Sequence, residues 1–276
     1  MADELDRARK ALRELSKSLK SLPGDPSPKV VHKLRTAARR VEAIAAVLAQ
    51  AKGKESQRLL KAIEPVRKAA GGVRDMDVLM GNARRLARSS AGDSLHRLAE
   101  QLQIARRRHA GDLAHEMNRR GDAMREHLKN YSKLVKAALA PVRGASPAGD
   151  LPVPSHDDVR TAALIVVREL GQWPSLNAEN IHAFRLKVKE LRYILQLGDD
   201  ADPRLLDALA NVQRRVGDWH DWHQLDEMAR EILHPERDAA LLERIALNAR
   251  RRFERALAAA NNLRGKYLTM PLAQGA

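Results

Sequence analysis

Two segments of the sequence place a histidine and several cations at the same helical spacing. The first set, at i, i+3 and i+7, is His32, Arg35 and Arg39. The second set, at i, i+3, i+7 and i+10, is His182, Arg185, Lys189 and Arg192. Side chains at these intervals share one face of an α-helix, so the sets predict two lines of positive charge, here the first and the second basic row. At about 1.5 Å per residue, the second row is about 15 Å long.

Acidic side chains that could neutralise these rows are scarce in the same segments. Between residues 29 and 50 the only acid is Glu42, and between residues 178 and 197 the only acids are Glu179 and Glu190. Uncompensated like charges three or four residues apart repel each other by about 0.2–0.5 kcal/mol. The alternative to a binding site is a helix face whose charges are simply solvated. The same repulsion occurs at matched positions in both segments, however, and this favours an external anion as the partner of the cations.

A row of cations suits a linear polyanion, which binds by counterion release and dissociates as salt rises. Nucleic acid and inorganic polyphosphate are both ligands of this kind. The chain holds three Trp, three Tyr and two Phe, and only Tyr193 lies beside a row. Single-strand binders stack bases on aromatic side chains, and no helix-turn-helix spacing is found for duplex binding. Polyphosphate is therefore favoured, and a nucleic-acid-associated protein is the alternative.

The two rows belong to an internal repeat. Residues 31–44 align without gaps on residues 181–194 at an offset of 150, and residues 66–79 align on residues 212–225 at an offset of 146. A duplicated helical unit predicts two pseudo-symmetric helical lobes. The cations of the second aligned pair could extend the rows, and they are Arg67, Lys68, Arg214 and Arg215.

Glycine and aspartate also match in the second aligned pair. Gly71 corresponds to Gly217, and Asp75 corresponds to Asp221. Glycine interrupts helices and aspartate caps them, so we expect a turn at each glycine. Asp75 would cap the helix after the first turn, and Asp221 or Asp218 would cap the helix after the second.

Apolar residues recur with helical period along most of the chain, and no segment alternates as a strand would. The expected helices are at about residues 2–21, 29–50, 56–70, 73–89, 91–139, 156–170, 178–197, 203–216, 219–232 and 235–263. The longest break contains four prolines between residues 141 and 155. We therefore predict lobe one at 1–140, a linker at 141–155 and lobe two at 156–276.

Composition narrows the class of protein. The 276 residues carry 50 basic and 35 acidic side chains, and there is no cysteine. Residues 1–138 hold 31 basic and 16 acidic residues, whereas residues 139–276 hold 19 of each, so the first half is expected to supply most of a polyanion surface. Because there is no cysteine, disulfides and thiol catalysis are excluded. Because there is no long apolar run, we expect a cytoplasmic protein without membrane contact.

No segment predicts a catalytic centre. Paired catalytic carboxylates, a nucleophile elbow and a glycine-rich phosphate loop are all missing, so we expect a non-enzymatic protein without cofactor or resident metal. His220 and His223 form only a weak metal-binding pattern, since no third remote ligand is evident. One alternative stays open, in which the two aspartate-bearing turns hold Mg²⁺ against a phosphate chain, in a polyphosphate- or triphosphate-processing accessory protein or hydrolase.

The repeated motifs resemble those of the CHAD family, the conserved-histidine α-helical domain. In the first repeat they are VHKLR at 31–35 and RDMDVL at 74–79. In the second they are IHAFRLKVKELRY at 181–193 and GDWHDW at 217–222. The resemblance covers nearly the whole chain, so residues 1–276 are expected to form a single CHAD domain.

This resemblance implies two four-helix bundles with long helices around a basic central groove. It also implies binding of inorganic polyphosphate and association with polyphosphate granules. Carried over by position, the anion-binding residues would be His32, Arg35, Arg39, Arg40, His182, Arg185, Lys189 and Arg192. The copies differ at two positions, because Glu42 corresponds to Arg192 and Glu190 corresponds to Arg40.

Overall fold

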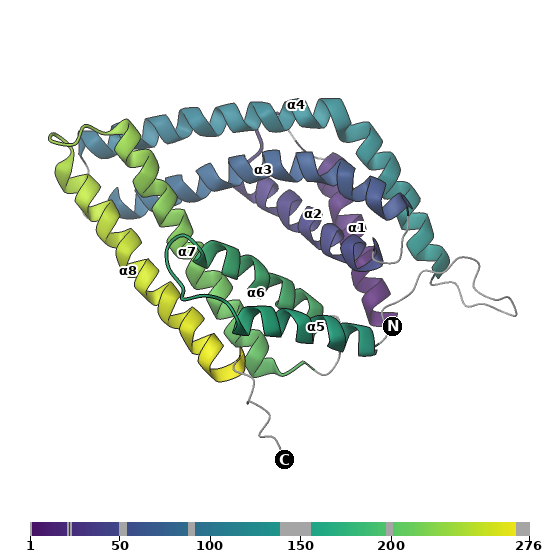
Figure 1. The fold of residues 1–276 in the computed structure, drawn as a ribbon. Helices are drawn as coiled ribbons and strands as arrows, with labels where there is room; N and C mark the ends of the chain where they lie inside the picture. Colours follow the sequence, from purple (N-terminus) through teal and green to yellow (C-terminus); the bar gives the residue numbers. More distant parts are fainter. Residues whose placement is uncertain are drawn as a thin grey trace, which may run out of the picture. The chain divides into compact units, whose positions relative to one another are not determined.

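The computed structural model describes residues 2–20, 22, 24–49, 54–87, 92–138, 156–196 and 201–268. Within these ranges the chain is all-α, with one short π-helical segment and no strand (Figure 1). The helices are α1 (Ala2–Lys20), α2 (Pro28–Ala49), α3 (Lys54–Ala87), α4 (Asp93–Ala138), α5 (His156–Gly171), α6 (Ile181–Leu195), α7 (Pro203–Ile232), α8 (Ala239–Leu263) and the π-helical η1 (Arg264–Leu268). No described helix is long and apolar enough to cross a membrane.

Helices α3 and α7 are longer than the sequence predicted. Gly71 and Gly217 lie inside continuous helices and do not end them. The predicted caps are therefore wrong, since Asp75, Asp218 and Asp221 all lie within helices. A glycine inside a helix costs about 1 kcal/mol relative to alanine, a small penalty that packing of the neighbouring core residues overrides.

Helix α6 begins at Ile181, three residues later than predicted. Two asparagines form a local hydrogen-bonded turn just before it. The backbone N–H of Asn177 donates to Asn180 Oδ1 at 3.0 Å, and the backbone N–H of Asn180 donates to Asn177 Oδ1 at 3.0 Å. Asparagine side chains compete with helical hydrogen bonds in this way, so the turn fixes the start of the helix and sets His182 in its first turn.

The chain divides into two compact units. Unit 1 comprises Met1–Met80 and Glu100–Pro154, and unit 2 comprises Gly81–Ala99 and Ser155–Ala276. Helices α3 and α4 each contribute residues to both units, so the division does not follow chain order. The linker predicted at 141–155 lies outside the described residues.

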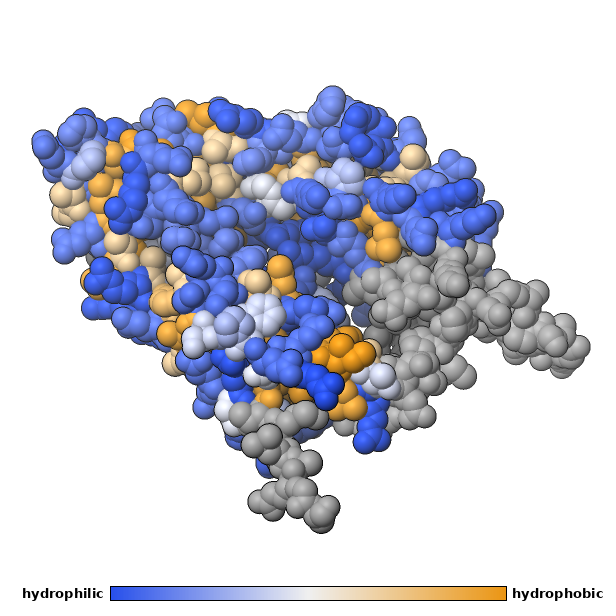
Figure 2. All heavy atoms as spheres, in the orientation of Figure 1, coloured by the Kyte–Doolittle hydropathy of each residue, from blue (hydrophilic) through white to orange (hydrophobic). Residues whose placement is uncertain are grey.

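Each unit has its own apolar core, to which four α-helices contribute. Helices α1, α2, α3 and α4 supply the core of unit 1, and α5, α6, α7 and α8 supply that of unit 2, with Leu268 of η1. The helical period predicted for the apolar residues is confirmed on α2 and α6, since Val31, Leu34, Val41, Phe184 and Val188 are all buried. Hydrophilic side chains cover most of the face drawn in Figure 2. Burial of one stripe on α2 and α6 leaves the basic stripe of each helix outside the core.

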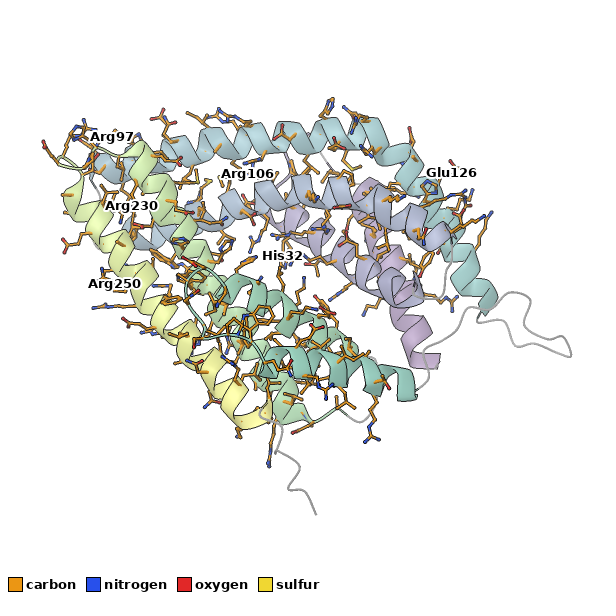
Figure 3. All side chains as sticks on the ribbon, viewed as in Figure 1. His32, Arg97, Arg106, Glu126, Arg230 and Arg250 are labelled. Carbon is orange, nitrogen blue, oxygen red and sulfur yellow. The ribbon has the colours of Figure 1, made fainter. Side chains whose placement is uncertain are left out.

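A buried carboxylate in unit 2 holds the start of α4 beside the turn between α7 and α8. Asp238 is 1% exposed, and its Oδ1 accepts from Ser94 Oγ and from Arg97 Nη2, each at 2.5 Å. Its Oδ2 accepts the backbone N–H of His234 at 2.9 Å. Figure 3 shows Arg97 at this end of the unit. Donation from Ser94, His234 and Arg237 and the charge of Arg97 hold the pKa of Asp238 far below its usual range.

Candidate anion-binding site

Helix α2 presents the first basic row beside α3. His32 is exposed, whereas Arg35 and Arg39 are half-buried. Arg35 Nη1 donates to Asp75 Oδ1 of α3 at 3.2 Å, so a carboxylate compensates part of the charge of this row. Arg40 does not join the row, because it lies next to α1 and its Nη1 donates to Glu14 Oε2 at 2.8 Å.

The two cations predicted to extend the first row from α3 also have carboxylate partners. Arg67 Nε lies 2.6 Å from Glu42 Oε1 of α2, and both side chains are about three-quarters buried. Lys68 Nζ lies 2.7 Å from Glu64 Oε1 on the same helix, in a pair that is largely exposed. Water and salt weaken an exposed pair of this kind, so Lys68 can change partners easily, whereas Arg67 is held by Glu42.

Arg74 is a cation that the sequence analysis did not include in the row. It lies seven residues beyond Arg67, on the same face of α3, and its charge acts on His32. Partial burial, followed by the charges of Arg74 and Arg35, lowers the pKa of His32 below its usual value of 6.5. The charges of Arg74 and Arg35 thus both act on the position of His32, in addition to the effect of burial.

Helix α6 presents the second basic row beside α7, and Gln213 of α7 contacts two of its members. Arg185 Nε donates to the backbone carbonyl oxygen of Gln213 at 3.1 Å, and Arg192 Nη1 donates to Gln213 Oε1 at 2.8 Å. Within the described residues no carboxylate pairs with Arg192. Its charge is therefore oriented by an uncharged amide and is not cancelled.

Two further contacts involve residues of α6 in and beside this row. Lys189 Nζ lies 5.4 Å from the centroid of the Tyr193 ring. Glu190 belongs to the other side of α6, where its Oε2 lies 3.2 Å from Lys187 Nζ, and Lys187 also pairs with Glu169 of α5 at 2.7 Å. Glu190, which occupies the position of Arg40 in the second copy, is thus paired with Lys187.

His182 packs against a second histidine. Its ring centroid lies 4.7 Å from that of His220 in α7. Partial burial, followed by the charge of Arg185, lowers the pKa of His182 below 6.5. Sequence reasoning missed His220 as a neighbour of the row, although it aligns with Arg74 at the offset of 146, so the repeat itself carried the signal.

Gly217, which was predicted to break a helix, and Gly72 instead allow close approach of side chains. A Cβ added to Gly217 would lie 3.2 Å from Arg185 Nη2, and a Cβ added to Gly72 would lie 2.7 Å from His109 Nδ1. Gly217 therefore allows the guanidinium of the second row to lie against the backbone of α7. Gly72 does the same for a histidine of α4 in unit 1.

Arg214 and Arg215 do not join the second row. Gln213 is the α7 residue that contacts the row. Arg215 follows it by two positions, about 200° further around the helix, and so lies on another face. Arg215 lines a cavity between α7 and α8 instead. Arg214 is exposed, and its Nη2 donates to Asn211 Oδ1 at 2.9 Å.

The histidines of α7 do not form a metal centre. Across the described ranges no three histidine, aspartate or glutamate side chains gather as a metal-binding group. His220 contacts His182, whereas His223 stacks on Trp219 at 5.4 Å and lies 3.5 Å from Glu227 Oε1. Asp218 pairs with Arg252 at 3.0 Å.

Comparison with known proteins agrees with this helical architecture. A solved structure, "PptA from Streptomyces chartreusis", is similar over 95% of this chain and 96% of its own, with a TM-score of 0.60 and 15% sequence identity. That likeness concerns the fold. A search of curated proteins gives no match. The model of the CHAD domain matches residues 6–230, a stretch that includes both basic rows, and the chain therefore belongs to the CHAD family.

Proposed function

We propose that this protein binds inorganic polyphosphate without hydrolysing it, and that it associates with polyphosphate granules through this binding. Each basic row, one in each unit, is a contact surface for polyphosphate, with Arg74 beside the first row and His220 beside the second. Membership of the CHAD family supports the proposal, because the family resemblance implies this ligand.

The observation that carries the proposal is the second basic row. Arg192 is held by the amide of Gln213, and the nearby Glu190 pairs with Lys187. The guanidinium group of Arg192 is thus oriented by an uncharged partner, and its charge is available to phosphate. Each neutralised phosphate releases counterions, so binding should weaken steeply as salt rises.

The surroundings of the rows favour polyphosphate binding over two alternatives, binding of nucleic acid and hydrolysis assisted by Mg²⁺. Nucleic acid would gain little here from base stacking, since the only aromatic ring beside the second row, Tyr193, lies under Lys189. Hydrolysis assisted by Mg²⁺ would need carboxylates directed at the phosphates. Asp75 pairs with Arg35 and Asp218 pairs with Arg252, so these carboxylates stabilise arginines.

Competition binding across a salt series tests the proposal. Long-chain polyphosphate, DNA and RNA of matched total charge are titrated against the full chain, and we expect polyphosphate to bind most tightly at every salt concentration. Stronger binding of DNA or RNA would instead place the protein among nucleic-acid-binding proteins. Release of phosphate from polyphosphate in the presence of Mg²⁺ would contradict the non-enzymatic part of the proposal.

A pair of row variants tests the site itself. Arg35→Ala and Arg185→Ala should each weaken polyphosphate binding while the helical circular dichroism signal is kept. Arg250→Ala is the matched control, since Arg250 is an exposed arginine of α8 outside both rows (Figure 3). Equal affinities for all three variants and the unmodified protein would exclude the rows as the binding site.

A further inference from the structure

A second cationic surface lies between α7 and α8, on a face of α7 that does not contact α6. It is a cavity of about 640 Å³, within the usual range for small-molecule sites. The side chains that line it are Ala208, Asn211, Arg215, Arg255, Ala258, Ala259, Asn262, Leu263, Lys266 and Tyr267. Three of them are cations and none is an acid, so the cavity has a net positive charge that its own lining does not offset.

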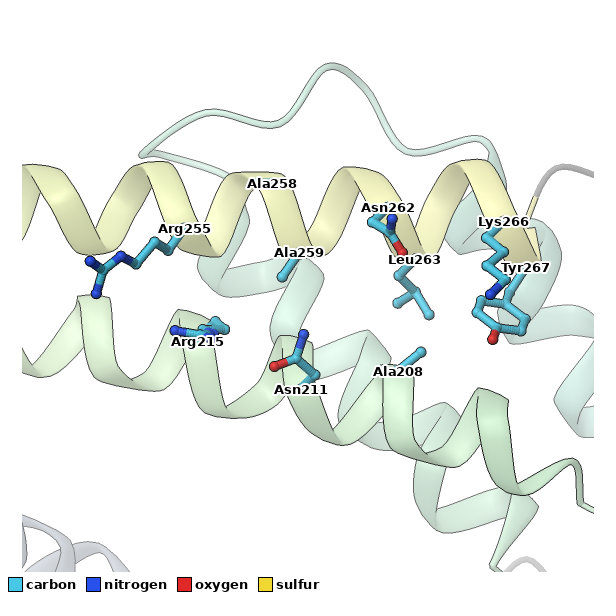
Figure 4. Close-up of a pocket in the computed structure, with 10 residues that line it drawn as sticks. All are labelled: Ala208, Asn211, Arg215, Arg255, Ala258, Ala259, Asn262, Leu263, Lys266 and Tyr267. Atoms are coloured by element: carbon cyan, nitrogen blue, oxygen red, sulfur yellow. The ribbon is translucent and has the colours of Figure 1, made fainter.

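Polar and cationic groups are distributed along the whole cavity. Figure 4 shows Arg215 of α7 and Arg255 of α8 at one end, Lys266 and Tyr267 at the other, and Asn211 and Asn262 between them. Alanines form the wall between these groups, and their small size leaves the space open. An elongated ligand with anionic groups would therefore meet cations at both ends and amides along its length.

The hydrogen bond from Arg214 determines what Asn211 can offer to a ligand. Arg214 Nη2 donates to Asn211 Oδ1 at 2.9 Å, so the carbonyl side of this amide is already used. The remaining group of Asn211 is its NH₂, which is a donor. Two guanidinium groups, an ammonium group and an amide donor match a ligand rich in acceptor oxygens, and guanidinium groups bind phosphate in a bidentate manner.

We propose that this cavity binds the diphosphate or triphosphate group of a small ligand, at a site separate from the basic rows. Arg215 and Arg255 hold the phosphates from two helices, and Asn211 donates to a bridging or terminal oxygen. The ligand is either free oligophosphate or the phosphate group of a nucleotide. At the far end Lys266 Nζ lies 5.3 Å from the ring centroid of the half-buried Tyr267, so a nucleotide base would have to displace Lys266 to stack on this ring.

Isothermal titration of the full chain with inorganic tripolyphosphate tests the site. The double variant R215A/R255A should lower the affinity for tripolyphosphate by about tenfold or more, because each charged hydrogen bond contributes about 1.5–3 kcal/mol. R250A removes one cation from α8 outside the cavity and should change this affinity by less than about twofold. Thermal melting of each variant checks that the fold is kept.

The outcomes separate this site from polyphosphate binding by the rows. R192A should weaken binding of long polyphosphate while one equivalent of tripolyphosphate still binds. The proposal is overturned by equal tripolyphosphate affinities in R215A/R255A and R250A, or by loss of tripolyphosphate binding in R192A alone. A tighter complex with ATP than with tripolyphosphate, abolished by Y267A, identifies a nucleotide as the ligand, and equal affinities identify free oligophosphate.

Discussion

The two repeats carry the same basic pattern but compensate its charge in opposite ways. In the first repeat an acid of α2, Glu42, holds Arg67 of α3 at 2.6 Å. In the second repeat the aligned positions are Arg192 of α6 and Gln213 of α7, which are joined by a hydrogen bond of 2.8 Å. Cation and partner have exchanged helices, and the partner has lost its charge. In the half of the chain with the large positive excess, Arg67 is thus neutralised by a carboxylate, whereas in the electrically balanced half Arg192 is bound by an uncharged amide.

This difference shows that net charge is a poor guide to where an anion binds. The excess of basic residues in 1–138 predicted that the first half would supply most of a polyanion surface. Locally, Arg35 pairs with Asp75 and Arg67 pairs with Glu42. A ligand responds to the charge that remains after such pairing, so we expect Arg192, bound by an amide, to contribute more to polyphosphate binding than Arg67, paired with Glu42.

The largest expected effect compares matched double variants of the two repeats. Arg185→Ala with Arg192→Ala should lower the affinity for polyphosphate about 100-fold, because two charged hydrogen-bonding groups are lost. Arg35→Ala with Arg67→Ala should lower it only about tenfold, since Glu42 already offsets the charge of Arg67. Titration with long polyphosphate at fixed salt measures both, and a larger loss from the first repeat would reverse the comparison.

A single substitution should make the first repeat resemble the second. Glu42→Gln converts the partner of Arg67 into an uncharged amide, and we expect the affinity for polyphosphate to rise about threefold to tenfold as a repelling charge is removed. Glu64→Gln is the control, because its pair with Lys68 is largely exposed and screened. Should Glu42→Gln leave affinity unchanged or reduce it, Arg67 takes no part in binding.

The aligned glycines give a smaller and equally matched test. Gly217→Ala should weaken polyphosphate binding about threefold, since the new methyl group would lie 3.2 Å from Arg185 Nη2 and shift that guanidinium. Gly71→Ala should leave binding unchanged and raise stability slightly, because no atom lies within 4 Å of its added Cβ. Binding titrations and thermal melts distinguish these outcomes, and equal behaviour of the two variants would contradict the structural difference.

Protonation of the two histidines should give the smallest effect. Protonated imidazole adds a cation, so affinity for polyphosphate should rise as pH falls below about 6.5, by about threefold for each histidine. The pKa values of His32 and His182 are lowered, so in the free protein protonation occurs at lower pH than for an ordinary histidine. Both lowered values also predict that folding stability decreases as pH falls through this range, because the unfolded chain binds these protons more readily.

His32→Gln and His182→Gln check this prediction in parallel. Each substitution should remove part of the rise in affinity at low pH while leaving affinity at neutral pH nearly unchanged. We expect His182→Gln to destabilise its unit only slightly if His220 keeps its position. A thermal melt would measure this loss of stability. A pH dependence that persists in the double variant would assign the rise to another group.

Much of the helical structure could be predicted from the spacing of residues alone. The apolar stripes of α2 and α6, the two basic rows and the repeat were predicted, because helical periodicity places every third or fourth residue on one face. The continuity of α3 and α7 was not, because a glycine is a weak local signal that packing overrides. Arg40 was included through the family resemblance and Arg215 through the repeat, and neither shows which neighbouring helix a long side chain reaches. The repeat aligns His220 with Arg74, whereas only tertiary structure shows that Gln213 contacts Arg192.

The division of α3 and α4 between the units has a consequence for any attempt to produce one half of the protein alone. Residues 81–99 belong to unit 2, where Leu86 and Leu95 are buried and Ser94 and Arg97 bind Asp238. A fragment starting at residue 156 would leave Asp238 buried without these donors and would expose apolar surface to water. The duplicated halves are therefore not interchangeable modules. The later half needs residues 81–99, which are translated long before it. It should therefore fold only when that segment is present, either in the same chain or supplied as a separate peptide.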